Sequence, residues 1–467
     1  MHESLWCEVA VIGAGIAGLV LAHRLQRRGV DVRLFECSDR VGGTIGTQCW
    51  EGCTIEAGPF SVMPRSDEFA GLIGELGLNP KPGTPAGRTG RFVFTHGRLR
   101  RVPHGPLALL TTDLLTWAAK AALIRSVLRS PPPDTDPKSV TLHEFASRRL
   151  GPRAAECIVG PAALGIYGAP ATDLLLDSCV PRIAKADRQA RSLVGVLRKL
   201  KAERHLNGKA KPTERPAWAK SLITFPNGLS ALPAALSRSL GDRLHLQSPA
   251  SRLRRNHDGL AFETLNAAIH AKRLVVATGP RAAAAILRPI CPEIADQTDR
   301  IRFASLAVVH LLFDQADLPD RPRGFGLLVR PNEPNMDPLL GVQIPGDIFP
   351  DQVPLGRVLL RAIVRDGSTA NDKDLVQATL AAIGRTMTVN VASPVAANVI
   401  RWPDALPIYD VDHARAAERI QQQISVEPGI QLLTTLHGGL GINDRIVAAE
   451  RIAGAMLKDS GSRSLRS

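Results

Sequence analysis

A glycine-rich turn near the N-terminus is the first feature of this sequence with a defined chemistry. Residues 7–12 (CEVAVI) predict a buried strand, and GAGIAG follows directly, with glycines at 13, 15 and 18 and a helical pattern over 17–28. Such a turn lets the backbone approach a pyrophosphate at a helix N-terminus, where free N–H groups and a partial positive charge attract anions. The turn therefore indicates a phosphate-binding site.

An acidic residue lies at the distance from this turn that a dinucleotide site requires. Residues 31–36 (DVRLFE) predict a second strand, and Glu36 ends it 23 residues after Gly13. Its carboxylate is placed there to accept hydrogen bonds from the hydroxyls of an adenosine ribose. Strand, turn, helix and acid together predict a βαβ unit that binds a dinucleotide.

Two following segments distinguish a flavin from a nicotinamide. DRVGGT at residues 39–44 resembles the RxGG signature of FAD-dependent amine oxidases, phytoene desaturases and protoporphyrinogen oxidases, in which a second glycine turn passes along the cofactor. IEAGPFSV at residues 55–62 resembles the E-x-GP-x-S segment of the same superfamily, which bends beside the flavin. The resemblance implies non-covalently bound FAD.

Later segments resemble one branch of that superfamily, the oxygen-dependent protoporphyrinogen oxidases with their coproporphyrinogen-oxidising relatives. Individually they are short, but they follow the family's order over most of the chain. They are SVTLHEFASRRLGPRAAECIVGPAALGIYGAPATDL (139–174), LITFPNGLSALPAALS (222–237), FASLAVVHLLFD (303–314), GFGLLVRPNE (324–333), ALPIYDVDHARA (405–416) and LHGGLGINDRI (436–446).

This resemblance implies an oxidase of protoporphyrinogen IX or coproporphyrinogen III in haem or other tetrapyrrole biosynthesis. The flavin would take hydride from the porphyrinogen in three two-electron steps, and O2 or a quinone would reoxidise it, O2 giving H2O2. The cofactor carries that chemistry, so no catalytic side chain is assigned. Three alternatives remain: an amine oxidase, a carotenoid desaturase, and a catalytically degenerate FAD-binding partner protein.

The resemblance also implies site residues. Ala250 would present its backbone to adenine, residues 440–442 would line the isoalloxazine, and Trp402 would lie near the ring. Arg91 matches a basic residue that grips a substrate propionate, a role that suits a bidentate guanidinium, although a surface arginine is an equal alternative. The implied FAD-binding residues are Gly13, Ala14, Gly15, Ile16, Ala17, Gly18, Glu36, Cys37, Arg40, Gly42, Gly43, Thr44, Gly58, Pro59, Phe60, Ser61, Ala250, Trp402, Leu440, Gly441 and Ile442.

Three positions depart from the family pattern. Thr44 replaces a larger residue, Asn227-Gly228 replaces a glycine pair, and Thr434-Thr435 stand where many relatives have Gly-Asn or Gly-Ser. A threonine forced to positive φ would be strained. Either the local turns differ or FAD binding is weakened, and the second outcome would favour the degenerate alternative.

Positive charge is concentrated in two segments. The net charge is +14 over 467 residues, and residues 88–129 and 185–220 hold most of the excess. The alternatives are a solvated basic surface, an acidic membrane surface, or a polycarboxylate substrate. Nucleic acid is not expected, because the basic stretches lack interleaved aromatic residues and no nucleic-acid-binding signature occurs.

One helical segment bears on a membrane contact. Residues 107–128 carry an apolar stripe with alternating spacings of three and four, flanked by arginines. The stripe indicates a helix either on the protein's own core or in a membrane interface on the inner face of the cell membrane. Acidic and basic residues interrupt it, so a spanning helix is not expected. Seven cysteines without CxxC spacing predict no disulfide framework and no metal site, which favours the cytoplasm.

The expected fold class is α/β, with a Rossmann-like FAD-binding domain, a mixed-sheet substrate domain and a helical, membrane-facing insertion. Strands are predicted at 301–314 and 357–365, and an antiparallel meander at 243–278. A homodimer is compatible with the sequence. The expected divisions are FAD-binding parts at 1–64, 205–300 and 395–467, substrate-domain parts at 65–90 and 301–394, and the insertion at 91–204.

Overall fold

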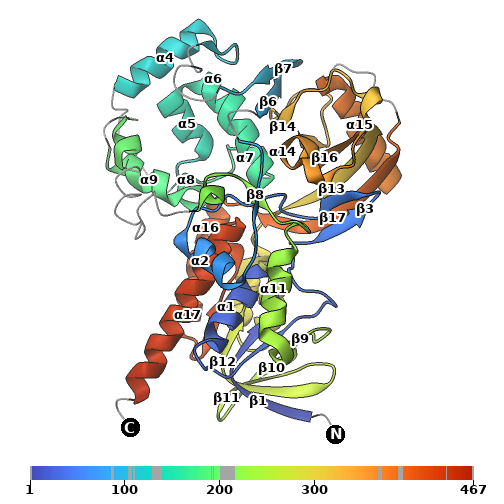
Figure 1. Ribbon diagram of the computed structural model, residues 1–467. Helices are drawn as coiled ribbons and strands as arrows, with labels where there is room; N and C mark the ends of the chain where they lie inside the picture. The colour runs from blue at the N-terminus through green and yellow to red at the C-terminus, as the bar shows by residue number, and fades with distance from the viewer. Residues whose placement is uncertain are drawn as a thin grey trace.

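Two seven-stranded sheets organise the molecule (Figure 1). The first lies in the lobe that holds both termini, and the second lies in the opposite lobe beside a group of helices. The computed structural model describes residues 3–85, 89–103, 108, 111–128, 139–190, 192, 194–199, 216–366, 371–387, 393–437 and 439–464.

The first sheet has the order β10-β11-β12-β1-β2-β9, and β18 pairs with β12. Strands β12, β1, β2, β9 and β18 pair in parallel, whereas β10, β11 and β12 form an antiparallel meander. The predicted βαβ unit is thus confirmed, and the meander predicted over 243–278 is confirmed from residue 251 onward, while residues 244–245 pair in parallel with β2. The strands are β1 Glu3–Ile12, β2 Val32–Phe35, β9 Leu244–His245, β10 Ser251–Asn256, β11 Gly259–Glu263, β12 Ala267–Val276 and β18 Ile430–Leu432.

Helices cover both faces of this sheet. One core joins it to α1, α2, α11 and α17, and a second core joins the other face to α12, α13 and α16. A parallel strand buried on both faces is apolar throughout, which explains the run CEVAVI. These helices are α1 Ile16–Gln26, α2 Asp67–Glu75, α11 Ala231–Leu240, α12 Pro280–Leu287, α13 Pro292–Asp299, α16 Val411–Val426 and α17 Ile442–Ser464.

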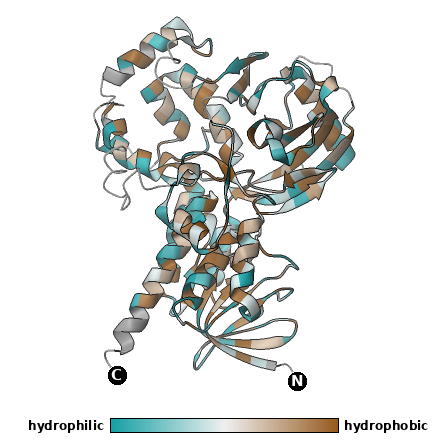
Figure 2. Ribbon diagram, viewed as in Figure 1, coloured by the Kyte–Doolittle hydropathy of each residue, from teal (hydrophilic) through white to brown (hydrophobic). Residues whose placement is uncertain are grey.

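The second sheet has the order β17-β13-β16-β15-β14-β6-β7 and is mixed, because β6 and β14 pair in parallel. The strands predicted at 301–314 and 357–365 are confirmed as β13 and β16. Helix α15, Asp372–Met387, packs on the sheet through Leu375 and Ile383, and apolar residues are concentrated there (Figure 2). The strands are β6 Gly90–Thr95, β7 Arg98–Arg101, β13 Phe303–Asp314, β14 Gly324–Val329, β15 Leu339–Gln343, β16 Arg357–Arg365 and β17 Ala396–Pro407.

Smaller elements connect the lobes and build the helical group. Hairpin β3–β4, Thr47–Trp50 and Cys53–Glu56, and the pair β5–β8, Lys81–Pro82 and Ile223–Thr224, are two-stranded. Further helices are α4 Trp117–Leu128, α5 Leu142–Leu150, α6 Pro152–Ala154, η1 Ala155–Val159, α7 Gly160–Tyr167, α8 Leu176–Cys179, α9 Pro181–Arg188, η2 Ala217–Lys220, η3 Gly241–Arg243, η4 Gln315–Asp317, α14 Pro345–Ile348, η5 Pro350–Gln352 and η6 Thr435–His437.

The helix predicted over 107–128 is interrupted in the structure. Helix α4 forms its second half, and Ala108 and Thr111 are also helical, but residues 112–116 are not; residues 107, 109 and 110 lie outside the described part. Leu114 of the predicted stripe is buried, but its members Trp117 and Ile124 in α4 are 81% and 51% exposed, and the buried Leu123 lies outside the stripe. Within α4, the stripe therefore does not face the protein's own core. Among the described residues, no helix is long and apolar enough to cross a membrane.

Three expected domain boundaries differ from the sheet topology. Strands β6 and β7 belong to the second sheet, although 91–204 was expected to be a helical insertion. Strand β17 also joins that sheet instead of the first lobe. Helix α2 packs through Phe69 and Leu72 into the core of the first sheet, outside the second lobe expected for 65–90. The chain therefore changes lobe at different residues from those that local patterns indicate.

Candidate flavin site

The first glycine turn has the geometry of a phosphate cradle. Gly13 has φ +105°, and a Cβ there would lie 2.9 Å from the carbonyl oxygen of Ala277. Gly15 is the N-cap of α1 without a side-chain cap, and a Cβ on it would meet nothing within 4 Å. Ile16 and Ala17 begin the helix, so their N–H groups lie in the first, unpaired turn. An anion can reach this helix end closely, as a dinucleotide requires.

Glu36 faces this turn. Its carboxylate accepts hydrogen bonds from the Ala14 amide at 2.7 Å and from the Ser38 amide and hydroxyl at 3.0 and 2.7 Å. Burial would raise the pKa of Glu36, but these hydrogen bonds and one from the Cys37 thiol outweigh it and lower the pKa. The side chain is therefore an anionic acceptor at neutral pH, suited to ribose hydroxyls. Ala250 is partly buried against the core between the first sheet and helices α12, α13 and α16, which also contains Phe35 next to Glu36.

The RxGG segment folds against the first turn. Gly42 donates its amide to the Ala14 carbonyl at 2.8 Å and forms a bridge with Gly15. A Cβ on Gly43, which has φ +59°, would lie 3.3 Å from the Cα of Gly15. The Arg40 guanidinium closes the second turn by donating to the Gly43 carbonyl at 2.9 Å. The two glycine turns thus form one continuous surface.

The threonines that depart from the family pattern are not strained. Thr44, Thr434 and Thr435 are all described, and none has positive φ. Thr44 instead presents its carbonyl so closely to Gly58 that a Cβ at Gly58 would overlap it. The turns differ locally, and backbone strain gives no reason to expect weak FAD binding.

The segment 56–61 is held from both lobes. Glu56 is 2% exposed and accepts from the Leu229 amide and the Thr47 hydroxyl, both at 2.8 Å. Burial raises the pKa of Glu56 to about 7. From the second sheet, the Trp402 indole donates to the Ala57 carbonyl at 2.7 Å. The half-buried Gly58, Pro59 and Ser61 follow within this fixed turn.

Arg91 lies near the same turn. Its guanidinium carbon is 5.2 Å from the centre of the Phe325 ring, a cation–π distance. Phe325 in turn contacts Phe60 edge-to-face at 6.2 Å between ring centres. One aromatic ring therefore separates Arg91 from segment 56–61.

The last predicted segment meets the start of α2. Helix α17 begins at Ile442, directly after Leu440 and Gly441, and Asn443 accepts from the Arg65 and Ser66 amides at 3.0 and 3.2 Å. These contacts place residues 440–442 beside the polypeptide that follows segment 56–61.

Comparison with known proteins decides the family. The sequence profile described as "Flavin containing amine oxidoreductase" matches residues 16–432. The chain belongs to this family. It is a flavoenzyme, an oxidoreductase, and its cofactor is FAD.

Named relatives of this flavoenzyme cover most of its length. Protoporphyrinogen oxidase 1 of Arabidopsis thaliana chloroplasts is 26% identical, covering 87% of this chain and 79% of its own. Coproporphyrinogen III oxidase of Propionibacterium freudenreichii is 28% identical, covering 96% and 90%. A crystal structure from Exiguobacterium sp. 255-15, provisionally named protoporphyrinogen oxidase, has a TM-score of 0.78 and 24% identity, covering 98% of this chain and 99% of its own. The structure of a putrescine oxidase has a TM-score of 0.71 and 17% identity, covering 98% of this chain and 100% of its own. The structural likeness supports the fold.

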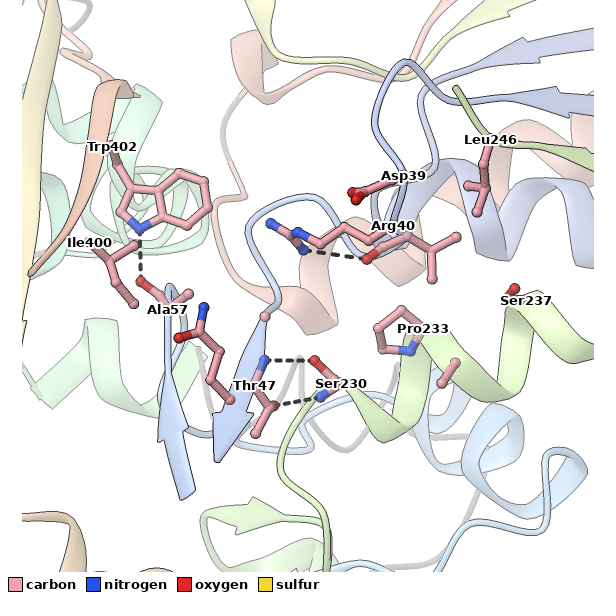
Figure 3. Close-up of a pocket in the computed structure, with 14 residues that line it drawn as sticks. Asp39, Arg40, Thr47, Ala57, Ser230, Pro233, Ser237, Leu246, Ile400 and Trp402 are labelled. Atoms are coloured by element: carbon pink, nitrogen blue, oxygen red, sulfur yellow. Dashed lines mark hydrogen bonds between the residues drawn. The ribbon is translucent and has the colours of Figure 1, made fainter. Parts of the chain in front are cut away.

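A pocket of about 450 Å³ adjoins the flavin site (Figure 3). Trp402 of β17 lies on one side and Arg40 on the other, with Pro233 of α11 below. At its floor Thr47 and Ser230 exchange hydrogen bonds of 2.7 and 3.0 Å. The lining residues that sequence patterns missed include Thr47, Gln48, Ser230, Pro233, Ser237, Leu246 and Ile400.

The described residues contain no candidate metal-binding site. Within those ranges, no group of three His, Cys, Asp or Glu side chains could hold an ion.

Proposed function

We propose that this flavoenzyme oxidises a porphyrinogen, protoporphyrinogen IX or coproporphyrinogen III, in tetrapyrrole biosynthesis. The observation that carries the proposal is the position of Arg91, one aromatic ring from segment 56–61. A guanidinium there can bind a propionate carboxylate of a macrocycle lying over the flavin. The names of the curated relatives agree with this substrate class.

FAD, when bound, supplies the acceptor for hydride from the substrate. We assign the pyrophosphate to residues 13–18 and 42–44 and the ribose to Glu36. Segment 58–61, Trp402 and residues 440–442 would enclose the isoalloxazine, with Cys37, Arg40 and Ala250 toward the adenosine. O2 is the proposed final acceptor, and a quinone is its alternative.

The amine-oxidase alternative needs an aromatic cage, and the two tyrosines do not form one. Tyr167 and Tyr409 pack edge-to-face at 6.0 Å, and Tyr409 is fully buried. Their hydroxyls donate to the carbonyls of Cys179 and Thr435, at 3.0 and 2.9 Å. Both rings are thus committed to the core of the helical group, which favours the porphyrinogen.

Aerobic turnover tests the proposal. The FAD-loaded protein is expected to generate porphyrin fluorescence from protoporphyrinogen IX or coproporphyrinogen III, and the ratio of rates identifies the preferred substrate. Arg91→Gln should raise KM about tenfold with little change in kcat, since a charged hydrogen bond contributes roughly 1.5–3 kcal/mol. Arg365→Gln, an exposed arginine at the end of β16, is the control. A yellow protein with no turnover above the enzyme-free rate would refute the substrate class.

We also propose a peripheral contact between α4 and an anionic membrane surface. Trp117, Ile124 and Arg125 are exposed, whereas Lys120 is buried, with its ammonium 4.5 Å from the Trp117 ring. Amphipathic helices with exposed aromatic and basic residues bind such interfaces. The double change Trp117→Ser/Ile124→Ser should reduce co-sedimentation with anionic vesicles about tenfold, whereas Trp6→Ser should not. Equal sedimentation of both variants would contradict the contact.

A cytoplasmic location is proposed with this contact, on the inner face of the membrane. All seven cysteines are free thiols, as a reducing compartment would keep them. Self-association as a homodimer stays a prediction of the sequence.

A further inference from the structure

A row of polar side chains crosses four strands of the second sheet. Gln343 of β15 lies opposite Arg361 of β16, which lies opposite His310 of β13, which lies opposite Asn398 of β17. Residues directly opposite on neighbouring strands share one face of a sheet. Arg361 is 3% exposed and His310 is fully buried. The row is therefore a buried polar stripe on the face that contacts Glu56.

Arg361 carries a positive charge, but among the described residues its guanidinium donates hydrogen bonds only to uncharged acceptors. Its guanidinium donates to the Gln343 side-chain oxygen at 2.6 Å, to the Glu56 carbonyl at 3.4 Å and to the Gly58 carbonyl. Burial lowers the pKa of Arg361 to about 10, so it stays charged at neutral pH. A buried charge without an ion-pair partner is costly, which points to a charge that balances it in the working enzyme.

The guanidinium is aimed at the turn assigned to the flavin. It holds the Gly58 carbonyl, while Trp402 holds the Ala57 carbonyl from the same sheet. We propose that Arg361 is a positioning residue that fixes the Gly58-Pro59 turn, and that its charge stabilises the reduced flavin and raises the flavin midpoint potential. This inference rests on the cofactor placement given under the proposed function.

The physical reason is charge balance. Uptake of two electrons and one proton by the neutral oxidised flavin leaves its ring system with one net negative charge. A cation behind the turn favours that state over the oxidised one, and charges near the flavin nitrogens are how proteins tune its potential. The porphyrinogen would supply the electrons and protons.

Glu56 opposes this effect as pH rises. Its carboxylate is contacted by Thr47 and Leu229 and attracted by the Arg361 charge from the second sheet, while His310 interacts with the Glu56 backbone. Burial lowers the pKa of His310 to about 3, so that ring is neutral. With a Glu56 pKa of about 7, the Arg361 charge is unopposed below pH 7 and partly offset above it.

Potentiometric titration of the FAD-loaded protein without porphyrinogen tests the proposal. Arg361→Gln should lower the stability of bound reduced FAD relative to bound oxidised FAD at least tenfold. For a two-electron couple, this corresponds to a fall of about 30 mV in the midpoint potential. Arg361→Lys should retain most of the potential. Arg321→Gln is the matched control, because Arg321 is also buried but is paired bidentately with Asp347 at 2.7 and 2.8 Å. A wild-type potential in Arg361→Gln would overturn the proposal.

A second variant keeps the test decisive if Arg361→Gln does not retain FAD. Glu56→Gln removes the opposing charge and should raise the potential at pH 8 toward the value expected for wild type when Glu56 is protonated. An unchanged potential at pH 8 would refute the charge effect. Because no porphyrinogen is present, these results are independent of substrate identity, and a protein inactive on porphyrinogens can still show the potential shifts.

Discussion

Gly18→Ala is expected to abolish stable FAD binding and to destabilise the first sheet. A Cβ at this position would overlap the Gly13 carbonyl oxygen and lie 3.3 Å from the Ala277 Cβ. The overlapped atom is backbone, so relief requires moving α1 away from the glycine turn. Overpacking of this kind costs about 1–3 kcal/mol or more. Because Gly15 bridges Gly42, the displacement also separates the two glycine turns.

Flavin absorbance per protein and denaturant unfolding would measure both effects. Gly71→Ala is the matched control, since Gly71 lies within helix α2 and a Cβ there meets nothing within 4 Å. That control should keep FAD and gain up to about 1 kcal/mol from helix propensity. Full FAD content together with wild-type stability in Gly18→Ala would show that the turn can open without consequence.

The first lobe was predictable because local patterns determine it. CEVAVI is apolar along its whole length, as a strand covered by helices on both faces must be. The glycine spacing then specifies one turn geometry, and Glu36 accepts the Ala14 amide as the motif requires. Each of these inferences uses residues close together in the sequence.

The second lobe was less predictable because its pairings are long-range. Strand β6 pairs with β14, and nothing in GRFVF indicates a partner so distant in sequence. The stripe on α4 had the correct period, but periodicity does not specify which side of a helix is covered. Trp117 and Ile124 were therefore correctly grouped, and only the structure shows that they are exposed.

The candidate flavin site likewise combines residues that local motifs identify with residues that only long-range contacts bring there. Motifs identified the glycine turns and segment 58–61, but not the residues that hold this segment in place. Glu56 meets Leu229 across the fold, and Arg361 reaches Gly58 from another sheet. The sequence did contain one signal: Arg361 separates the apolar runs VLL and AIV in the middle of the strand RVLLRAIVR, and a charge at such a position needs a specific set of acceptors.

Glu56 is expected to make the stability of the folded protein fall as pH rises from about 4.5 to 7. The pKa of this carboxyl is raised from its ordinary 4.5 to about 7 because burial outweighs the hydrogen bonds from Leu229 and Thr47. Below pH 4.5 the group is protonated in both the folded and the unfolded chain, and its contribution is fully present. Between the two pKa values only the unfolded chain ionises, so the free energy of unfolding decreases.

The size of this loss follows from the shift. At 1.36 kcal/mol per pH unit, the change from 4.5 to about 7 corresponds to about 3 kcal/mol, complete once the pH exceeds 7. Urea unfolding of the FAD-saturated protein at pH 5, 6, 7 and 8 would measure it. In Glu56→Gln this decrease should disappear, so the stability difference between variant and wild type should grow by about 2.5 kcal/mol in favour of the variant from pH 5 to pH 8, because part of the loss has already occurred at pH 5.

Glu51→Gln is the control, since Glu51 is an exposed acid at the tip of the same β3–β4 hairpin. Its stability should follow that of wild type at every pH. Parallel curves for Glu56→Gln and wild type would mean that the carboxylate ionises in the folded protein without cost. The Arg361 guanidinium would then already neutralise it, and the same charge could not be available to stabilise the reduced flavin.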